Sequence, residues 1–391
     1  MQTTCVCCDG KLAEVISLGE QPLANKYPKS VSDFDAEFSH EMLVFLCADC
    51  GYCHIPCEAN REVFFEDYYY LSSVNQELVS HFTEMANELA RIGAKFVLDV
   101  GSNDGILLKP LKELGVHCIG VDPSRNVGEI ANKNGLETFI GFFDDDIADR
   151  VRREKGCPDV IVASSVFTHL EDPGHFFSVC DQLLDKDGKI IIEVEFLNDI
   201  IESFGFERFY YDRPHYYTLE SLKRLGLRYG FVVVGASRIN VHGGSIRVSF
   251  KRVGESDLLM ERLQGQMGFL GRDEIINHFE DFKRECTNLK NTLKEFKNNS
   301  IDVVGYGCPA RFSTITNFAD IGPDLLPFVI DDSPLKQSRY SPGKHVPIIP
   351  WDGAPSVSTY LVFAYEYINS IRSKVSRSDV KFFQPIPFKE L

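Results

Sequence analysis

Long hydrophobic runs and an excess of basic residues are both missing from this sequence. No apolar stretch approaches the roughly 18 residues that a membrane-spanning helix needs. The 41 lysines and arginines against 57 aspartates and glutamates give a net charge of −16 at pH 7, which disfavours non-specific binding to nucleic acid or to membrane surfaces. The first residues, Met1–Cys5, lack the basic and apolar segments of a secretory signal. These absences predict a cytoplasmic protein that binds neither nucleic acid nor membrane.

Internal repeats and low-complexity linkers are also absent from the 391 residues. At roughly 100–200 residues per domain, a chain of this length is expected to form two or three domains. The composition, with 44% hydrophobic and 25% charged residues, is ordinary for a globular protein and provides material for a substantial core.

Cysteine, by contrast, is abundant, with 12 residues in the chain. Seven of them lie in the first 57 residues: Cys5, Cys7, Cys8, Cys47, Cys50, Cys53 and Cys57. A disulfide framework is typical of short secreted proteins, so we expect a reduced protein with a thiolate metal site instead.

Two C-x-x-C pairs, Cys5–Cys8 and Cys47–Cys50, have the spacing of a tetrahedral four-cysteine zinc site. Four thiolates leave no open ligand position, which predicts a structural ion formed by Cys5, Cys8, Cys47 and Cys50. Cys7, Cys53 and Cys57 are then non-ligands. The alternative is a group of buried cysteines without a metal.

A short buried strand over 95–100 runs directly into the glycine-rich turn Gly101–Gly105 and then into a helix. A helix over 75–92, with apolar residues at steps of four, three and four, precedes this strand. Such a turn lets a ligand approach the backbone closely. A second strand, 117–121, ends at Asp122, which can accept hydrogen bonds from both hydroxyls of a ribose.

The glycine-rich turn does not match a dinucleotide fingerprint, because Asn103 and Ile106 stand where that pattern requires glycine, and it lacks a P-loop lysine. The turn resembles motif I of class I S-adenosylmethionine-dependent methyltransferases. This resemblance implies that the turn packs against the methionine part of the cofactor, with Asp99 near its amino end and Asp122 on its ribose. The candidate cofactor-binding residues are Asp99, Gly101, Ser102, Asn103, Gly105, Asp122, Phe143 and Ser165.

Alternatives remain for this set. The turn can be a plain βαβ connection without ligand, and Phe142 or Phe143 can either stack on adenine or pack in the core. Further strands are predicted over 159–163 and 189–194, and the third strand with its adenine-contacting loop is expected over 138–144.

Several separated motifs, in order, extend the resemblance to essentially the whole chain. They are 17–25 (SLGEQPLAN), 68–73 (YYYLSS), 241–247 (VHGGSIR), 304–310 (VGYGCPA) and 331–337 (DDSPLKQ). This series is similar to the zinc-containing sugar C-methyltransferases of deoxysugar biosynthesis, which methylate a carbon beside a ketone on a nucleotide-linked 4-keto sugar.

The resemblance implies an α/β protein with three parts: a zinc-binding module over 1–72, a class I methyltransferase (Rossmann-like) core over 73–200, and a substrate-binding and Rossmann-like C-terminal domain over 201–391. It also implies S-adenosylmethionine as cofactor, a structural zinc ion, a nucleotide-sugar substrate, and a monomer or small homo-oligomer.

Carbon methylation of this kind needs a base for the proton beside the ketone, a donor for the enolate oxygen and an in-line methyl sulfonium. In the family, a Tyr-x-Glu-His-x-x-Tyr element supplies the histidine base. Asp212 falls on its glutamate, Arg213 on its histidine and Tyr216 on its second tyrosine. The resemblance also implies that Tyr70 and His169 lie near the sugar.

Arg213 cannot act as a general base, because its guanidinium stays protonated. His215, Tyr70 or Asp212 is therefore the candidate base, and Arg213 suits a carboxylate, a phosphate or an enolate oxygen. O-methylation of a sugar or other small polar acceptor is the alternative reaction. A packed histidine at position 215, a helix cap near His169 and ion pairs at Asp212 and Arg213 are the structural alternatives.

In the C-terminal third, a helix is predicted over 219–228 and strands over 232–234 and 246–250. The segment between these strands contributes His242, Ser245 and Arg247, which could hold a pyrophosphate. A simple β-turn is the alternative.

A long amphipathic helix over 272–299 precedes a strand at 301–304 and a G-x-G-x-x-A turn at 305–310. Later strands are expected over 328–332 and 360–364. The sequence suggests no acid or second half that would complete a dinucleotide site. We therefore expect a degenerate Rossmann-like domain that closes over the sugar nucleotide rather than a second cofactor site.

Overall fold

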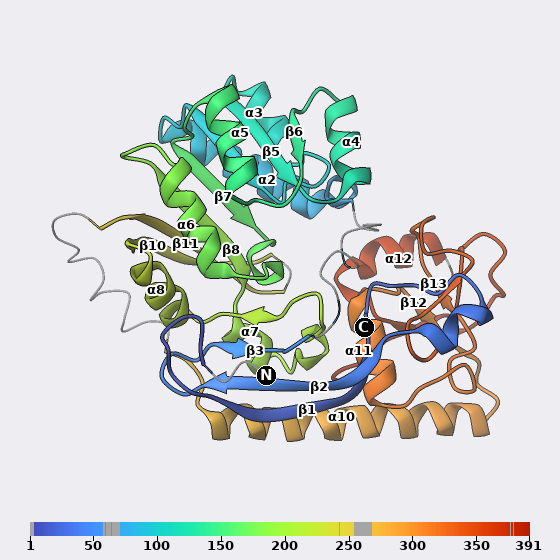
Figure 1. Ribbon diagram of the computed structural model, residues 1–391. Helices are drawn as coiled ribbons and strands as arrows, with labels where there is room; N and C mark the ends of the chain where they lie inside the picture. The colour runs from blue at the N-terminus through green and yellow to red at the C-terminus, as the bar shows by residue number, and fades with distance from the viewer. Residues whose placement is uncertain are drawn as a thin grey trace.

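The computed structural model describes residues 4–57, 59, 64, 71–241, 243–253, 268–375, 377 and 379–391. Figure 1 shows the N-terminal strands along the bottom, a central sheet with its helices above them, and a second α/β unit at the right. This arrangement confirms the predicted fold class. Within the described residues, every helix is too short or too polar to cross a bilayer.

The N-terminal module is an antiparallel sheet in the order β1-β2-β3-β9. Its strands are β1 (Leu12–Pro22), β2 (Ser39–Cys47), β3 (Cys53–His54) and β9 (His215–Tyr216), and the 3₁₀ helix η1 (Val31–Ala36) follows β1. The last strand comes from the middle of the chain, so the module is completed by a segment about 160 residues away in sequence.

The central sheet has the order β10-β11-β8-β7-β4-β5-β6. Its strands are β4 (Phe96–Val100), β5 (His117–Asp122), β6 (Thr138–Ile140), β7 (Val160–Ser164), β8 (Lys189–Glu195), β10 (Phe231–Ile239) and β11 (Ser245–Arg252). Strands β4 to β8 are parallel, and β4 is buried along its whole length, as expected for a parallel strand covered on both faces.

Helices cover both faces of this sheet. They are α2 (Gln76–Arg91), α3 (Leu108–Glu113), α4 (Arg125–Lys133), α5 (Asp145–Lys155), α6 (Pro173–Leu183) and α8 (Leu219–Arg228), with the 3₁₀ helices η2 (Ser72–Val74) and η3 (Phe167–His169). Helix α7 (Leu197–Glu202) and the 3₁₀ helix η4 (Phe206–Arg208) follow β8 and contact α10 and α11, respectively. Asn75 caps α2 by accepting from the amides of residues 77 and 78.

The expected domain boundary at residue 200 falls inside the central sheet. Strand β11 pairs antiparallel with β8, and β10 pairs with β11, so residues 231–252 belong to the core sheet rather than to the C-terminal unit. A short apolar run such as 232–234 can pair at the edge of either sheet. The strand that places β10 and β11 in the core sheet is β8, which pairs with β11 and is distant in sequence.

The C-terminal sheet has the order β14-β15-β13-β12-β16-β17-β18. Its strands are β12 (Val303–Tyr306), β13 (Val329–Ile330), β14 (Arg339–Tyr340), β15 (Pro347–Ile349), β16 (Thr359–Val362), β17 (Lys381–Gln384) and β18 (Lys389–Glu390). The helices are α10 (Arg272–Asn298), α11 (Ala310–Phe318) and α12 (Ile368–Val375), with the 3₁₀ helix η5 (Tyr365–Tyr367).

Helix α10 lies beneath β1 and the C-terminal unit (Figure 1). Its apolar stripe, which runs from Ile275 to Leu293 at helical spacing, is buried, and the helix contacts β1, α7 and β12. The helix therefore ties the zinc module, the core and the C-terminal unit together.

Candidate functional site

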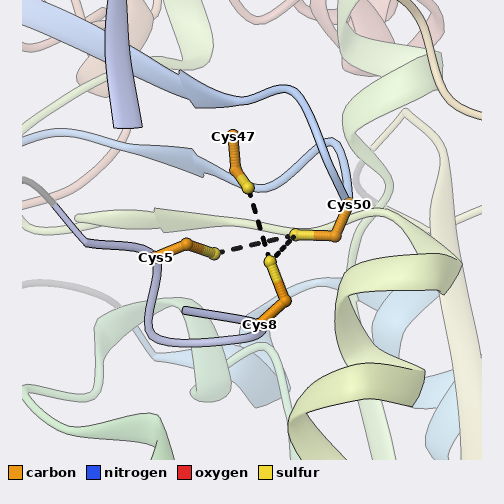
Figure 2. A group of neighbouring side chains, drawn as sticks. All are labelled: Cys5, Cys8, Cys47 and Cys50. Atoms are coloured by element: carbon orange, nitrogen blue, oxygen red, sulfur yellow. Dashed lines mark hydrogen bonds between the residues drawn. The ribbon is translucent and has the colours of Figure 1, made fainter. Parts of the chain in front are cut away.

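The four predicted zinc ligands converge between the β2–β3 turn and the N-terminal loop (Figure 2). The Sγ atoms of Cys5 and Cys50 are 3.7 Å apart, and Cys8 Sγ lies 3.5 Å from those of Cys47 and Cys50. A tetrahedral zinc ion with Zn–S bonds of about 2.3 Å requires S–S edges of about 3.8 Å, so the donor set fits zinc. Cys7 and Cys53 lie outside the cluster, as predicted.

Zinc binding requires these thiols to lose their protons. Burial raises the pKa of the Cys47 thiol to about 11, so at neutral pH this thiol would stay protonated unless a metal stabilised the thiolate. With four sulfur ligands the ion has no open position and can only be structural.

The zinc module holds the loop that carries the predicted catalytic element. Cys50 O accepts a hydrogen bond of 2.6 Å from Thr218 Oγ1, and the Ile55 amide donates to Pro214 O at 2.9 Å. Between these contacts β3 pairs with β9. The position of residues 210–217 therefore depends on the metal-bound knuckle.

A cavity of about 1600 Å³ lies where the three parts of the chain meet. We call it the central cavity. Its walls come from residues 23–26 of the N-terminal module, the Gly101 turn and the ends of β5 and β7 in the core, residues 210–213, and the turn after β12. A typical pocket for one small ligand is about 300–1,000 Å³, so this cavity has room for a cofactor and a second ligand.

The Gly101 turn has the geometry that the cofactor motif requires. Gly101 has φ of 75°, and a Cβ at this position would lie 2.7 Å from Val166, so only glycine fits. Asp122 Oδ2 accepts from the Asn103 amide at 2.9 Å, and Oδ1 from the Ser124 amide at 2.8 Å. Burial raises the pKa of Asp122, while these two N–H groups lower it. Each carboxylate oxygen keeps a second lone pair for a ribose hydroxyl.

Six of the eight candidate cofactor residues line the central cavity: Asp99, Gly101, Asn103, Asp122, Phe143 and Ser165. Ser102 and Gly105 do not. Ser102 is buried with its hydroxyl toward Gly120, and Gly105, with φ of 85°, leaves no space for a side chain beside Leu136. These two residues shape the turn, and a contact with the cofactor stays a prediction for them.

Arg213 lies in the cavity wall within a set of polar partners. Its Nη1 is 2.5 Å from Glu195 Oε2, its Nε lies 3.4 Å from His169 Nε2, and its guanidinium covers the ring of Tyr210 at 4.9 Å. Glu195, at the end of β8, was not predicted, because no local pattern distinguishes it from other strand residues. His169 Nδ1 contacts the backbone oxygen of Asp212. Both imidazole nitrogens are thus engaged, which fixes the neutral ring with its proton on Nδ1.

Asp212 also lines the cavity. Its Oδ2 accepts a hydrogen bond of 2.8 Å from Asn25 Nδ2, and its buried Oδ1 has no hydrogen-bond partner among the described residues. Burial raises the pKa of this carboxyl, while Arg213 and the Asn25 amide act in the opposite direction. A carboxylate in this state has a strong tendency to accept a proton.

Other predicted catalytic residues lie elsewhere. His215, the first alternative base, is 2% exposed in β9, bonds through Nδ1 to the Tyr52 hydroxyl at 2.5 Å and does not line the cavity. Tyr216 is fully buried, and its hydroxyl links the Tyr210 amide to the Arg208 carbonyl. Their burial follows from the pairing of β9 with β3 and indicates structural positions, and their catalytic roles stay predictions. Tyr70 lies outside the described residues.

The predicted pyrophosphate-binding group lies only partly within the described residues. Ser245 is buried and donates to Val241 O at 2.9 Å. Arg247 reaches the cavity, but its guanidinium is paired with Glu193 at 2.5 Å and Glu88 at 2.6 Å, which compensates its charge. His242 lies outside the described residues. The pairing partners come from β8 and α2, so the sequence near Arg247 did not reveal them.

The C-terminal turn contains an acid that the sequence analysis did not expect. Asp331, after β13, accepts from the Cys308 amide through Oδ2 at 2.7 Å and from the Ser333 amide through Oδ1 at 2.9 Å. Asp122 makes the same two contacts in the core: one to the glycine turn, one to the amide two residues on. The sequence pattern does not reveal this equivalence, because Gly305 and Asp331 are further apart in the chain than Gly101 and Asp122.

Comparisons with known proteins agree with this three-part architecture. Residues 5–65 match the family described as "Putative zinc binding domain", 74–236 a "Methyltransferase domain", and 240–387 a "C-methyltransferase C-terminal domain". The C-methyltransferase NovU of Streptomyces niveus is 26% identical over 98% of this chain and 94% of its own length.

Two further similarities are confined to part of the chain. A ubiquinone biosynthesis O-methyltransferase of Azorhizobium caulinodans is 28% identical over 34% of this chain and 53% of its own length. The crystal structure of a magnesium protoporphyrin IX methyltransferase from Synechocystis covers 45% of this chain and 83% of its own, with 16% identity. Its TM-score of 0.37 is too low to support any inference.

Replacement of Cys47 by serine is expected to abolish stoichiometric zinc binding and to lower the melting temperature by several degrees, because metal binding contributes directly to the stability of the module. Zinc content by atomic emission and thermal unfolding measure this. Cys157→Ser, at an exposed cysteine, is the control. Retention of one zinc per chain in Cys47→Ser would contradict the assignment.

Asp122→Asn is expected to weaken binding of S-adenosylmethionine by about tenfold or more, because the amide carries no charge and presents one acceptor oxygen instead of two. Isothermal titration calorimetry measures the affinity, with Asp187→Asn at an exposed position as the matched control. An unchanged dissociation constant would remove Asp122 from the ribose site.

His215→Phe is expected to lower stability, by roughly 1–3 kcal/mol for a lost buried hydrogen bond, and to leave the pH dependence of turnover unchanged. Denaturant unfolding and a pH–rate profile separate the two effects. If one limb of the pH–rate profile disappeared in this variant, His215 would again be a candidate catalytic residue.

Proposed function

We propose that this chain, a member of the zinc-containing C-methyltransferases that uses S-adenosylmethionine, methylates a carbon beside a ketone on a nucleotide-linked sugar. The observation that carries the proposal is the pair of equivalent acid-and-turn units, at Asp122 and Asp331, that face one cavity. The core unit serves the cofactor. The C-terminal unit is then available for the nucleotide of the substrate.

The surroundings of the C-terminal turn support an anionic nucleotide. The turn precedes α11, whose N-terminal amides favour anions. Arg311 lines the cavity, is paired with Glu366 at 2.7 Å, and keeps a buried Nη1 without a hydrogen-bond partner among the described residues. Lys336 Nζ lies 3.0 Å from Cys308 O at the same turn. A diphosphate can accept hydrogen bonds from these groups.

Asp212 is the base that this arrangement favours. Arg213 is permanently protonated, both nitrogens of His169 are engaged, and His215 does not line the cavity, while Tyr70 lies outside the described residues. A carboxylate in a water-poor site can remove a proton beside a ketone. The Arg213 guanidinium, held in place by Glu195, is positioned to stabilise a developing oxyanion.

The bond changes balance without a further reactant. Asp212 takes the proton from the carbon beside the ketone, and the electron pair of that C–H bond becomes the enolate. S-adenosylmethionine supplies an electrophilic methyl group, which leaves its sulfur and bonds to this carbon. S-adenosylhomocysteine and the methylated ketone are released, and Asp212 returns its proton to solvent.

The product identifies the acceptor atom. With ¹³C-methyl-labelled cofactor and a panel of thymidine-, guanosine- and uridine-linked 4-keto sugars, one sugar nucleotide is expected to give a carbon-bound methyl group by NMR. A methyl resonance in the ether range would establish O-methylation instead. Binding of the cofactor without turnover of any panel member would contradict the sugar-nucleotide proposal.

Asp212→Asn is expected to lower kcat by at least about 100-fold, the lower range for loss of a general base, and to leave the affinity for S-adenosylhomocysteine unchanged. Because burial raises the pKa of Asp212, wild-type turnover should fall with decreasing pH above the usual carboxylate range of about 4, as the base becomes protonated. Asp187→Asn provides the control. Wild-type kcat in Asp212→Asn would exclude the carboxylate as base.

A further inference from the structure

Asn25 comes from the N-terminal module, yet its side chain lies in the wall of the central cavity. Its Nδ2 donates to Asp212 Oδ2 at 2.8 Å, a contact between residues 187 positions apart. Among the described residues, Asn25 is the side-chain hydrogen-bond donor to the Asp212 carboxylate. A donated N–H stabilises the ionised form of a carboxylate and restricts its rotation.

The backbone on both sides of Asn25 is fixed to the C-terminal unit. Ala24 O accepts from Ser313 Oγ of α11 at 3.3 Å. Tyr27 is 4% exposed, and its hydroxyl donates to Cys308 O at 2.8 Å, on the glycine turn after β12. The amide of Tyr340 donates to Pro28 O at 3.0 Å. The Asn25 side chain is therefore presented by a loop that the nucleotide-binding unit holds rigidly.

Asp212 is held from the opposite side by other elements. Its backbone oxygen contacts His169 of η3, and its loop continues into β9 on the zinc module. Without Asn25, Oδ2 would lose its side-chain donor. Burial, which raises the pKa of Asp212, would then be opposed chiefly by the charge of Arg213.

We propose that Asn25 is a positioning residue for methyl transfer, which holds the Asp212 carboxylate ionised and oriented and couples it to the C-terminal nucleotide turn. The role of Asn25 in methyl transfer rests on the proposed function, in which Asp212 is the base. The hydrogen bond between Asn25 and Asp212 does not depend on the substrate. The zinc module thereby contributes to the reaction through a side chain as well as through stability.

The other titratable groups around Asp212 have defined places, so the effect of Asn25 can be separated from theirs. They are Arg213 and Tyr210 on the same loop, His169 from η3, Glu195 from β8 through Arg213, and Tyr27 from the N-terminal loop. None of them is altered by a substitution at position 25.

The first experiment measures the protonation of Asp212 directly in the full-length protein. Infrared titration of the carboxyl C=O band, taken as the difference from Asp212→Asn in the same background, is compared between wild type and Asn25→Ala. We expect the midpoint to move upward by about one pH unit or more, because the donor that favours the ionised form is gone. Asn87→Ala, whose amide donates to Thr83 O away from the cavity, should not move it.

A second measurement connects the shift to the reaction. With S-adenosylhomocysteine bound, thymidine-diphosphate-linked 4-keto-6-deoxyglucose is incubated in D₂O, and deuterium at the carbon beside the ketone is followed by NMR. In Asn25→Ala the acid limb of the exchange profile should move upward with the infrared midpoint, and exchange should recover at high pH. A merely structural role would reduce exchange equally at every pH.

The outcomes are distinct. An unchanged infrared midpoint, or a uniform loss of exchange, overturns the role of Asn25. A shifted midpoint with no exchange by wild type supports the contact and overturns the proposed base. Calorimetric binding of S-adenosylhomocysteine checks folding of the core; if Asn25→Ala binds none, Asn25→Leu, which is close to asparagine in volume and has neither donor nor charge, replaces it with the same expectation.

Discussion

The antiparallel pairing of β3 with β9 joins the zinc-binding module to the loop that follows the core sheet, with Cys53 opposite Tyr216 and His54 opposite His215. The pair is only two residues long. A strand of this length is stable only when its surroundings fix both partners. The zinc knuckle fixes one, through Cys50, and the body of the methyltransferase core fixes the other. The placement of the candidate catalytic loop depends on this junction.

From that junction the arrangement of the cavity follows. The segment that precedes β9 places Asp212 and Arg213 between residues 23–26 and the end of β8. The turn after β12 also lines the cavity, and there Asp331 repeats the contacts of Asp122. The proposed base, Arg213 and the two acid-and-turn units thus meet in one space, although they come from different parts of the chain.

The two arginines of the site, Arg213 and Arg247, have different numbers of carboxylate partners. Arg247 is paired with two glutamates and ties α2 to the sheet. Arg213 has one carboxylate partner, Glu195, and the His169 imidazole beside it, so fewer carboxylates surround it than surround Arg247. An arginine stays protonated where a histidine would titrate, so the proposed proton-accepting role is assigned to the neighbouring Asp212 carboxyl.

Local patterns in the sequence determined the zinc ligands, the Gly101 turn with Asp122, and the helices over 76–91 and 272–298, because each depends on spacing within a few residues. Tertiary structure alone decided that His215 is buried, that β10 and β11 extend the core sheet, and that Asp331 matches Asp122. It also brought Asn25 to Asp212 and Glu195 to Arg213. These facts depend on strand pairing and on contacts between residues far apart in the chain, for which periodicity carries no information.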